Sequence, residues 1–224
     1  MSSGTVCRCL PYRSLAACCS RASILDATAA PVLPRLAAAQ SVNPEVTAPV
    51  QRLNAALLAI MKSGSRTSFQ QRYEALAPVI EQTFDLQPGL QLSLDPRWAS
   101  FSSGEQAQLM TAFRRYTVAN YVANFAGCPG QSLAISPDIR VLLNGDRIVN
   151  TTIASPGKAS HRLGYVMRQT PSGWKAVHVL APGSISRVAK QRSDFRAVLS
   201  TGGSSALVAT LERKVYDLSG GRLA

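Results

Sequence analysis

The segment at residues 140–180 has the sequence RVLLNGDRIVNTTIASPGKASHRLGYVMRQTPSGWKAVHVL. Short runs rich in β-branched and aromatic residues alternate in it with hairpin-type turns, namely Asn144-Gly145-Asp146, Ser155-Pro156-Gly157 and Pro171-Ser172-Gly173. Together with a similar run just before it, the segment predicts strand-like stretches at 133–136, 140–143, 147–153, 161–169 and 174–180. We therefore expect an antiparallel sheet of about four strands.

Alternation along the last two strands assigns side chains to the two faces of the sheet, because successive side chains of a strand point to opposite sides. In residues 161–169, one face carries Leu163, Tyr165 and Met167 and the opposite face carries Arg162 and Arg168. In residues 174–180, one face is expected to carry Trp174, Ala176, His178 and Leu180, and the other Lys175, Val177 and Val179.

Helical patterns precede the strands. Apolar residues at helical spacing predict a helix at 50–61, and Ser68 with Gln71 forms a capping box that opens a second helix. The apolar stripe of the second helix consists of Phe69, Tyr73, Leu76, Ile80 and Phe84. Pro78 is expected to kink this helix or to divide it in two.

The longest helix is predicted at residues 103–125, where Ser102 and Glu105 form another capping box. Gly89 and Pro96, which lie before it, are expected to mark loops. Its apolar stripe is wide and rich in aromatic residues: Leu109, Met110, Phe113, Tyr116, Val118, Tyr121, Val122 and Phe125. Two further helices, at 184–200 and 204–218, close the chain. Helices, then an antiparallel sheet, then helices predict an α+β domain.

Composition restricts the classes of partner. The chain has 224 residues, 46% of them apolar, and 24 Lys and Arg against 12 Asp and Glu. It contains no apolar run long enough to span a membrane. The net charge of +12 favours anionic partners, which are nucleic acid, a membrane surface or lipid phosphates. The alternative is an ordinary solvated basic surface.

The first 47 residues differ from the rest and are expected to be a signal-like or disordered leader, with the domain at 48–224. Four of the five cysteines, Cys7, Cys9, Cys18 and Cys19, lie there, and only Cys128 lies further on. One cysteine in the folded part cannot make a disulfide framework, and the spacing fits no metal site. Residues 37–40 resemble a signal-peptidase site, and residues 15–18 resemble a lipoprotein box that would place a lipid on Cys18.

The helix at 184–200 carries four basic residues. On a helical wheel, Arg187, Lys190 and Arg196 lie outside the apolar arc, which is formed by Ile185, Val188, Phe195, Val198 and Leu199. Arg192 lies inside the arc, where a buried guanidinium is costly unless it is paired. Either its stem snorkels past apolar surface, or it meets an acceptor near a cavity, which we expect to belong to the protein rather than to a lipid phosphate. No groove-reading motif appears, so nucleic acid is not an expected partner.

Four stretches resemble periplasmic lipid-binding proteins of the MlaC, or toluene-tolerance auxiliary, family, and within it the hopanoid-biosynthesis-associated HpnM type. The resemblance covers residues 49–218. Its segments are PVQRLNAALLAIMK (49–62), FQQRYEALAPVIEQTFDL (69–86), RWASFSSGEQAQLMTAFRRYTVANYVANFAG (97–127) and GSISRVAKQRSDFRAVLSTGGSSALVATLERK (183–214). Two positions depart from the family pattern: Cys128 stands where the family often has Tyr, and His178 where it usually has Asp.

The resemblance implies a helical layer packed on a curved, cystatin- or NTF2-like sheet, with an internal apolar cavity between them. Acyl chains of a phospholipid or hopanoid would occupy the cavity. The protein would be a monomeric periplasmic carrier between an outer-membrane lipoprotein and an inner-membrane ABC transporter complex, without cofactor and without bond chemistry.

Candidate cavity-lining residues are Phe84, Trp98, Phe113, Tyr116, Tyr121, Tyr165, Met167, Trp174 and Phe195, with Arg192 and His178 as polar anchors. For each aromatic residue the alternative is an ordinary core position. Two other functions stay open. One is a scaffold for hopanoid-synthesis enzymes whose cavity is filled by side chains. The other is a small isomerase or dehydratase, for which the acid–base candidates are Asp85, Tyr121, Tyr165 and His178.

Overall fold

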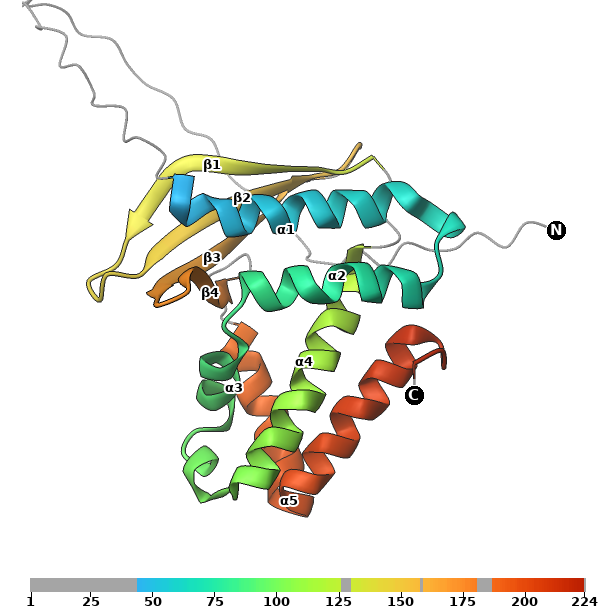
Figure 1. The fold of residues 1–224 in the computed structure, drawn as a ribbon, viewed down its shortest axis with the longest axis vertical. Coiled ribbons are helices and arrows are strands. Elements are labelled where there is room, and N and C mark those ends of the chain that lie inside the picture. Colours follow the sequence, from blue (N-terminus) through green and yellow to red (C-terminus); the bar gives the residue numbers. More distant parts are fainter. Residues whose placement is uncertain (1–43, 126–129, 158, 181–186, 224) are drawn as a thin grey trace, which may run out of the picture. The chain divides into compact units, whose positions relative to one another are not determined.

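The computed structural model describes residues 44–125, 130–157, 159–180 and 187–223 (Figure 1). They belong to one compact unit, Val42–Ala224. Residues 1–43 of the expected leader, with its cysteines, and Cys128 lie outside the described residues, as do Ile185 and the side chains of Arg187, Val188 and Lys190. Residues 44–47, which were also expected to belong to the leader, are the first turn of α1. The helices are α1 (Pro44–Ser63), α2 (Phe69–Thr83), α3 (Leu86–Leu94), α4 (Ser103–Phe125) and α5 (Arg187–Ser219), with short 3-10 helices at Gly64–Arg66 and Arg97–Ser100. The strands are β1 (Ser132–Val141), β2 (Arg147–Ala154), β3 (His161–Thr170) and β4 (Gly173–Leu180).

The sheet is a four-stranded antiparallel meander in the order β1-β2-β3-β4, which confirms the predicted number of strands. The two runs predicted at 133–136 and 140–143 are one strand, β1, whose pairing with β2 is interrupted between Ile135 and Ile139. Pro137 lies in this interruption and has no N–H to donate. An edge strand such as β1 tolerates proline because one side of it has no partner strand.

The predicted faces of β3 are confirmed, since Tyr165 and Met167 lie in the main core and Leu163 packs against it. The prediction for β4 is wrong beyond Ala176. Val166 pairs with His178 and Met167 with Ala176, so Val177 is an extra residue on β4. This bulge shifts the alternation, and Val179 joins Ala176 in the main core while Val177 and Leu180 belong to a cluster with Ile148 and Val166.

The helices begin and end largely where their caps predict. Ser68 and Gln71 form the reciprocal capping box at the start of α2, and Ser102 and Glu105 form the one at α4. Helix α1 begins at Pro44, six residues before the prediction, because proline at a first helical position is favourable and Val46 is buried in the main core.

Two expected breaks at proline and glycine do not occur. Helix α2 continues past Pro78 undivided, so the predicted division is wrong and the alternative of a kink stays a prediction. Gly89 lies inside α3 rather than in a loop. A Cβ at Gly89 would stand 3.6 Å from the Val177 carbonyl oxygen, so α3 packs close to β4 at this glycine.

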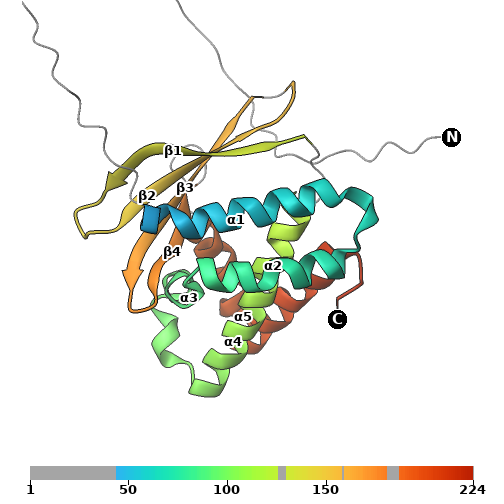
Figure 2. The ribbon, with the colours of Figure 1, turned by 45° about the horizontal axis from the view of Figure 1, so that its top comes forward.

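The helices pack around two cores, and α4 and α5 contribute to both of them. Helices α1 and α2 pack on one another and on the sheet (Figures 1 and 2), and their main core includes Leu53, Leu76, Ile80, Tyr165 and Met167. Helix α4 packs along α5, and α3 packs against both, around a second core of Leu90, Leu94, Leu109, Ala112, Phe113, Phe195, Leu199, Leu207 and Leu211. The α+β fold with helices on a curved antiparallel sheet is thus confirmed, and the second core is a feature that the sequence patterns did not predict.

Candidate functional site

A pocket of ≈ 70 Å³ lies where α3, α4 and β4 meet the first turns of α5. Most of its lining is apolar. The lining residues are Phe84, Asp85, Leu86, Gly89, Phe113, Tyr116, Thr117, Asn120, Tyr121, Val177, His178, Val179 and Gln191.

Helix α4 forms one wall through a single face. Its lining residues are three, four, seven and eight positions after Phe113, a pattern that places them on one face of a helix: Tyr116, Thr117, Asn120 and Tyr121. The Thr117 hydroxyl donates to the Phe113 carbonyl oxygen at 2.8 Å. Its polar atom is therefore already bonded within the helix.

The link between α2 and α3 forms a second wall beside β4. Phe84 makes an isolated parallel bridge to Ala176, and the Asp85 N–H donates to the Ala176 carbonyl oxygen at 3.0 Å. This short pairing places Phe84 next to two other aromatic rings, with centroids 5.6 Å from Tyr121 and 6.2 Å from Tyr165. All three rings belong to the main core, so the pocket borders that core.

The first half of α5 borders the pocket. Gln191 lines it, and the buried Phe195 ring meets Phe113 edge to face at 6.4 Å. Arg192 donates to the Asp95 carboxylate at 2.9 Å, and Arg97 donates to the Leu199 carbonyl oxygen at 2.9 Å. The prediction that Arg192 meets a protein acceptor is confirmed. These contacts hold the first half of α5 against the segment that follows α3.

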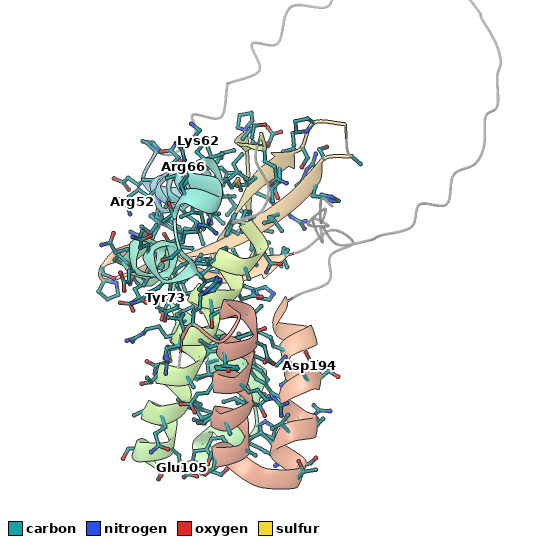
Figure 3. The ribbon with its side chains drawn as sticks, turned by 90° about the vertical axis from the view of Figure 1, so that its right-hand side faces the viewer. Arg52, Lys62, Arg66, Tyr73, Glu105 and Asp194 are labelled. Carbon is teal, nitrogen blue, oxygen red and sulfur yellow. The ribbon has the colours of Figure 1, made fainter. Side chains whose placement is uncertain are left out.

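The two halves of α5 meet at Gly203, whose φ of 65° and ψ of −157° are not helical. This matches the two helices predicted from the sequence. Beside the junction, the Ser204 hydroxyl donates to the Glu105 carboxylate, which also accepts from the Ser102 N–H at 2.9 Å. These hydrogen bonds lower the pKa of Glu105. Glu105 therefore ties the start of α4 to the start of the second half of α5, at the end of the helical group away from the sheet (Figure 3).

His178 lines the pocket from β4, and burial lowers its pKa below the ordinary histidine value. The imidazole is consequently neutral at neutral pH and adds no positive charge to the pocket. Within the described ranges, no three His, Cys, Asp or Glu side chains come together in a group that could hold a metal ion. None of the described helices combines the length and apolar character needed to cross a bilayer.

Five of the eleven predicted site residues line this pocket: Phe84, Phe113, Tyr116, Tyr121 and His178. Tyr165 and Met167 lie in the main core, and Trp98 and Phe195 belong to the second core. Trp174 lies under the Arg147 guanidinium at 5.0 Å. Three of the four acid–base candidates, Asp85, Tyr121 and His178, line the same pocket, whereas Tyr165 does not.

The predicted cavity lining left out eight of these residues, of which Asp85 was named from the sequence only as an acid–base candidate. Thr117 and Asn120 carried a usable signal, because each stands four residues from a predicted aromatic residue of α4. The others depend on contacts between distant segments and had no local signal: Leu86, Gly89, Val177, Val179 and Gln191.

Three comparisons with known proteins bear on this geometry. A family model described as MlaC protein matches residues 51–213. A search of curated proteins finds no match. Among solved structures, a phospholipid-binding protein from Ralstonia solanacearum, solved in complex with a phospholipid, has a TM-score of 0.67 and 21% sequence identity, over 78% of this chain and 99% of that chain. At this identity the likeness shows a common fold.

Proposed function

Because the chain belongs to the MlaC family, we propose that it is a non-catalytic lipid carrier that holds acyl chains in an enlarged form of the pocket between α3, α4, α5 and β4. The observation that carries the proposal is an apolar pocket in a fold shared with a protein that was solved with a bound phospholipid. Proteins of this family are periplasmic, and we assign this chain to the same compartment.

The pocket must open before it can hold a lipid. Its volume of ≈ 70 Å³ is well below the roughly 300–1,000 Å³ of ordinary small-molecule sites. Side chains of the second core occupy the adjoining space, among them Phe113, Phe195 and Leu199. A two-chain lipid would have to displace some of them, and each CH2 group it buries would contribute about 0.8 kcal/mol toward that displacement.

The first half of α5 is the wall best suited to move. It joins the second half at Gly203. Among its described residues, the hydrogen bonds to the segment after α3 are those of Arg192 to Asp95 and of Arg97 to the Leu199 carbonyl oxygen. The Arg192–Asp95 ion pair is substantially exposed, and such pairs contribute about 0–1 kcal/mol. We propose that this half-helix swings away from Phe113, so that acyl chains replace Phe195 against α4.

The polar lining residues Asn120, Gln191 and His178 are suited to the headgroup side, because few placed polar groups in an apolar site fix the orientation of a ligand. Arg192 already binds Asp95. A lipid phosphate could reach Arg192 only by competing with that carboxylate, so we place Arg192 at the gate rather than at the headgroup.

The ligand class in this proposal is a phospholipid or a hopanoid, as in the HpnM type that the sequence resembles. The proposed partners are an inner-membrane ABC transporter complex and an outer-membrane lipoprotein, with the protein acting as a monomer. The small volume of the pocket favours one other candidate, a scaffold for hopanoid-synthesis enzymes with its interior filled by side chains.

Native mass spectrometry of the purified full-length chain distinguishes the lipid carrier from the scaffold. The carrier should show adducts with the mass of a phospholipid or hopanoid. After delipidation it should take up a fluorescent phospholipid from vesicles. A protein without adducts that also takes up no lipid would contradict the carrier and favour the scaffold.

A further inference from the structure

The hairpin between β1 and β2 exposes apolar side chains at its tip. Leu143 is fully exposed, and Val141 is 64% exposed. Among the described residues, only Leu92 and Tyr216 are comparable exposed large hydrophobic side chains, and they lie on other elements. Two of four such residues thus fall within three positions. Single exposed apolar residues are ordinary, but a pair at one projecting turn indicates a contact surface.

The turn is pinned, so these side chains cannot fold back. Asp146 is 5% exposed, and its carboxylate accepts from Arg168 at 3.0 and 2.7 Å and from the Asn144 amide at 2.9 Å. The backbone is closed by the Leu142 N–H on the Asp146 carbonyl oxygen at 2.8 Å and by the Gly145 N–H on the Leu142 carbonyl oxygen at 3.0 Å. A rigid turn therefore presents Leu143 to the surroundings.

The two leucines after β1 have different surroundings. Leu142 packs against the cluster of Ile148, Val166 and Val177. Val141, the last residue of β1, points to the other face of the strand from its neighbours, and Leu143 lies beyond the strand in the turn. Both remain exposed. The hairpin can bury these two side chains only against something other than itself.

Basic residues stand one to three positions behind the apolar tip. Arg140 is exposed beside Val141, and Arg147 is the cross-strand partner of Val141. Arg168, on the neighbouring strand, offsets the charge of Asp146. The turn between β3 and β4 lies at the same end of the sheet (Figure 2). Apolar side chains ahead of guanidinium groups match a bilayer surface, where acyl chains lie below anionic headgroups.

We infer that the tip of the β1–β2 hairpin, residues 141–145, docks on an anionic lipid bilayer, with Leu143 and Val141 entering the acyl boundary and Arg140 and Arg147 contacting the headgroups. Leu143 and Val141 insert into the apolar part of the bilayer, and the two arginines make binding to negatively charged lipids stronger than binding to neutral ones. The docking surface is separate from the pocket, so it would bind membranes whether or not the pocket carries lipid.

Sedimentation of the full-length chain with vesicles tests this docking. Vesicles of phosphatidylglycerol and phosphatidylcholine in equal parts should bind the protein, more weakly in high salt, and vesicles of phosphatidylcholine alone should bind it poorly. Leu143→Asp should weaken binding at least about tenfold. Leu92→Asp, at an exposed leucine of α3, is the matched control and should bind like the unchanged protein.

Two further measurements are needed. The first distinguishes insertion of the tip into the bilayer from adsorption by charge alone, and the second distinguishes loss of docking from loss of lipid carrying. With Leu143→Trp, tryptophan emission should shift to shorter wavelength on adding the mixed vesicles, beyond any shift of the unchanged protein. Native mass spectrometry should show the same lipid adducts with and without Leu143→Asp, so loss of docking is distinguishable from loss of carrying.

Three results would overturn the inference. One is equal binding by Leu143→Asp and the unchanged chain, and another is equal binding to neutral and anionic vesicles. The third is self-association that Leu143→Asp abolishes in a protein that binds no vesicles, which would assign the tip to a second copy of the chain.

Discussion

Replacing Arg192 with methionine should speed lipid uptake while changing stability little. Arg192 Nη2 lies 2.9 Å from the Asp95 carboxylate, but the two side chains are 41% and 63% exposed. Solvent therefore screens the pair, and its removal should cost no more than about 1 kcal/mol. Methionine is also unbranched, so it retains the packing of the arginine stem against apolar neighbours.

The same free energy sets the expected change in rate. If the first half of α5 opens as a minor state, loss of about 1 kcal/mol raises the open population by up to about fivefold. Uptake of lipid, which requires the open state, should accelerate by the same factor. The melting temperature should fall by no more than about 4 °C, since roughly 2–4 °C corresponds to 1 kcal/mol in a domain of this size.

The assay is stopped-flow transfer of a fluorescent phospholipid from vesicles to delipidated protein, with thermal melts in parallel. Arg196→Met is the matched control, because Arg196 is an exposed arginine of the same half-helix. Asp95→Asn should reproduce the acceleration, and the double substitution should add little. An uptake rate that neither Arg192→Met nor Asp95→Asn changes would refute the gate at α5.

Three further substitutions test other parts of the structure. Thr117→Trp should abolish lipid uptake because the indole fills the pocket, whereas Thr111→Trp, at an exposed position of the same helix, should leave uptake and lipid adducts unchanged in native mass spectrometry. Gly203→Ala should lower the free energy of unfolding by about 1–3 kcal/mol, because a backbone with φ of 65° and ψ of −157° is nearly exclusive to glycine. A melting curve like that of the unchanged protein would contradict the junction described for α5. Asp146→Asn should lower stability by about 2 kcal/mol at neutral pH, because it removes charged hydrogen bonds from Arg168. Those hydrogen bonds lower the pKa of Asp146. The stability that its carboxylate contributes is therefore complete above the ordinary carboxyl pKa and is lost as the pH falls through the lowered pKa. Urea unfolding curves of Asp146→Asn and the unchanged protein should converge in acid, and a stability difference that does not change with pH would contradict this role.

Much of the fold could be predicted because its signals are local. The capping boxes at Ser68 and Ser102 and the turn at residues 144–146 each act over three or four residues, and each is present in the structure. The predictions that failed needed a distant partner. The burial of Val46 that extends α1 comes from packing in the main core, and the shift of faces in β4 comes from a bulge opposite Val166.

In the candidate site, too, the residues with a local sequence signal could be predicted and those brought in by distant segments could not. Periodicity identified the α4 side of the pocket, since Phe113, Tyr116 and Tyr121 lie on one helical face. It also singled out Arg192 as a charge within an apolar arc. It could not identify the acceptor, because Asp95 stands 97 residues away along the chain. Gln191 and Val177 likewise reach the pocket only through the docking of α5 and β4.

By itself, the order of residues determined the helices, the hairpins, the α+β class and, through its resemblance, the family. Those features depend on short-range hydrogen bonding and on the period at which apolar side chains recur. Only the tertiary structure decided that Tyr165 and Met167 are core, that Arg192 is held by Asp95, and that the pocket is ≈ 70 Å³ in this state. Close packing between distant segments sets these features, and a side chain's own sequence position does not specify which neighbour fills the space beside it.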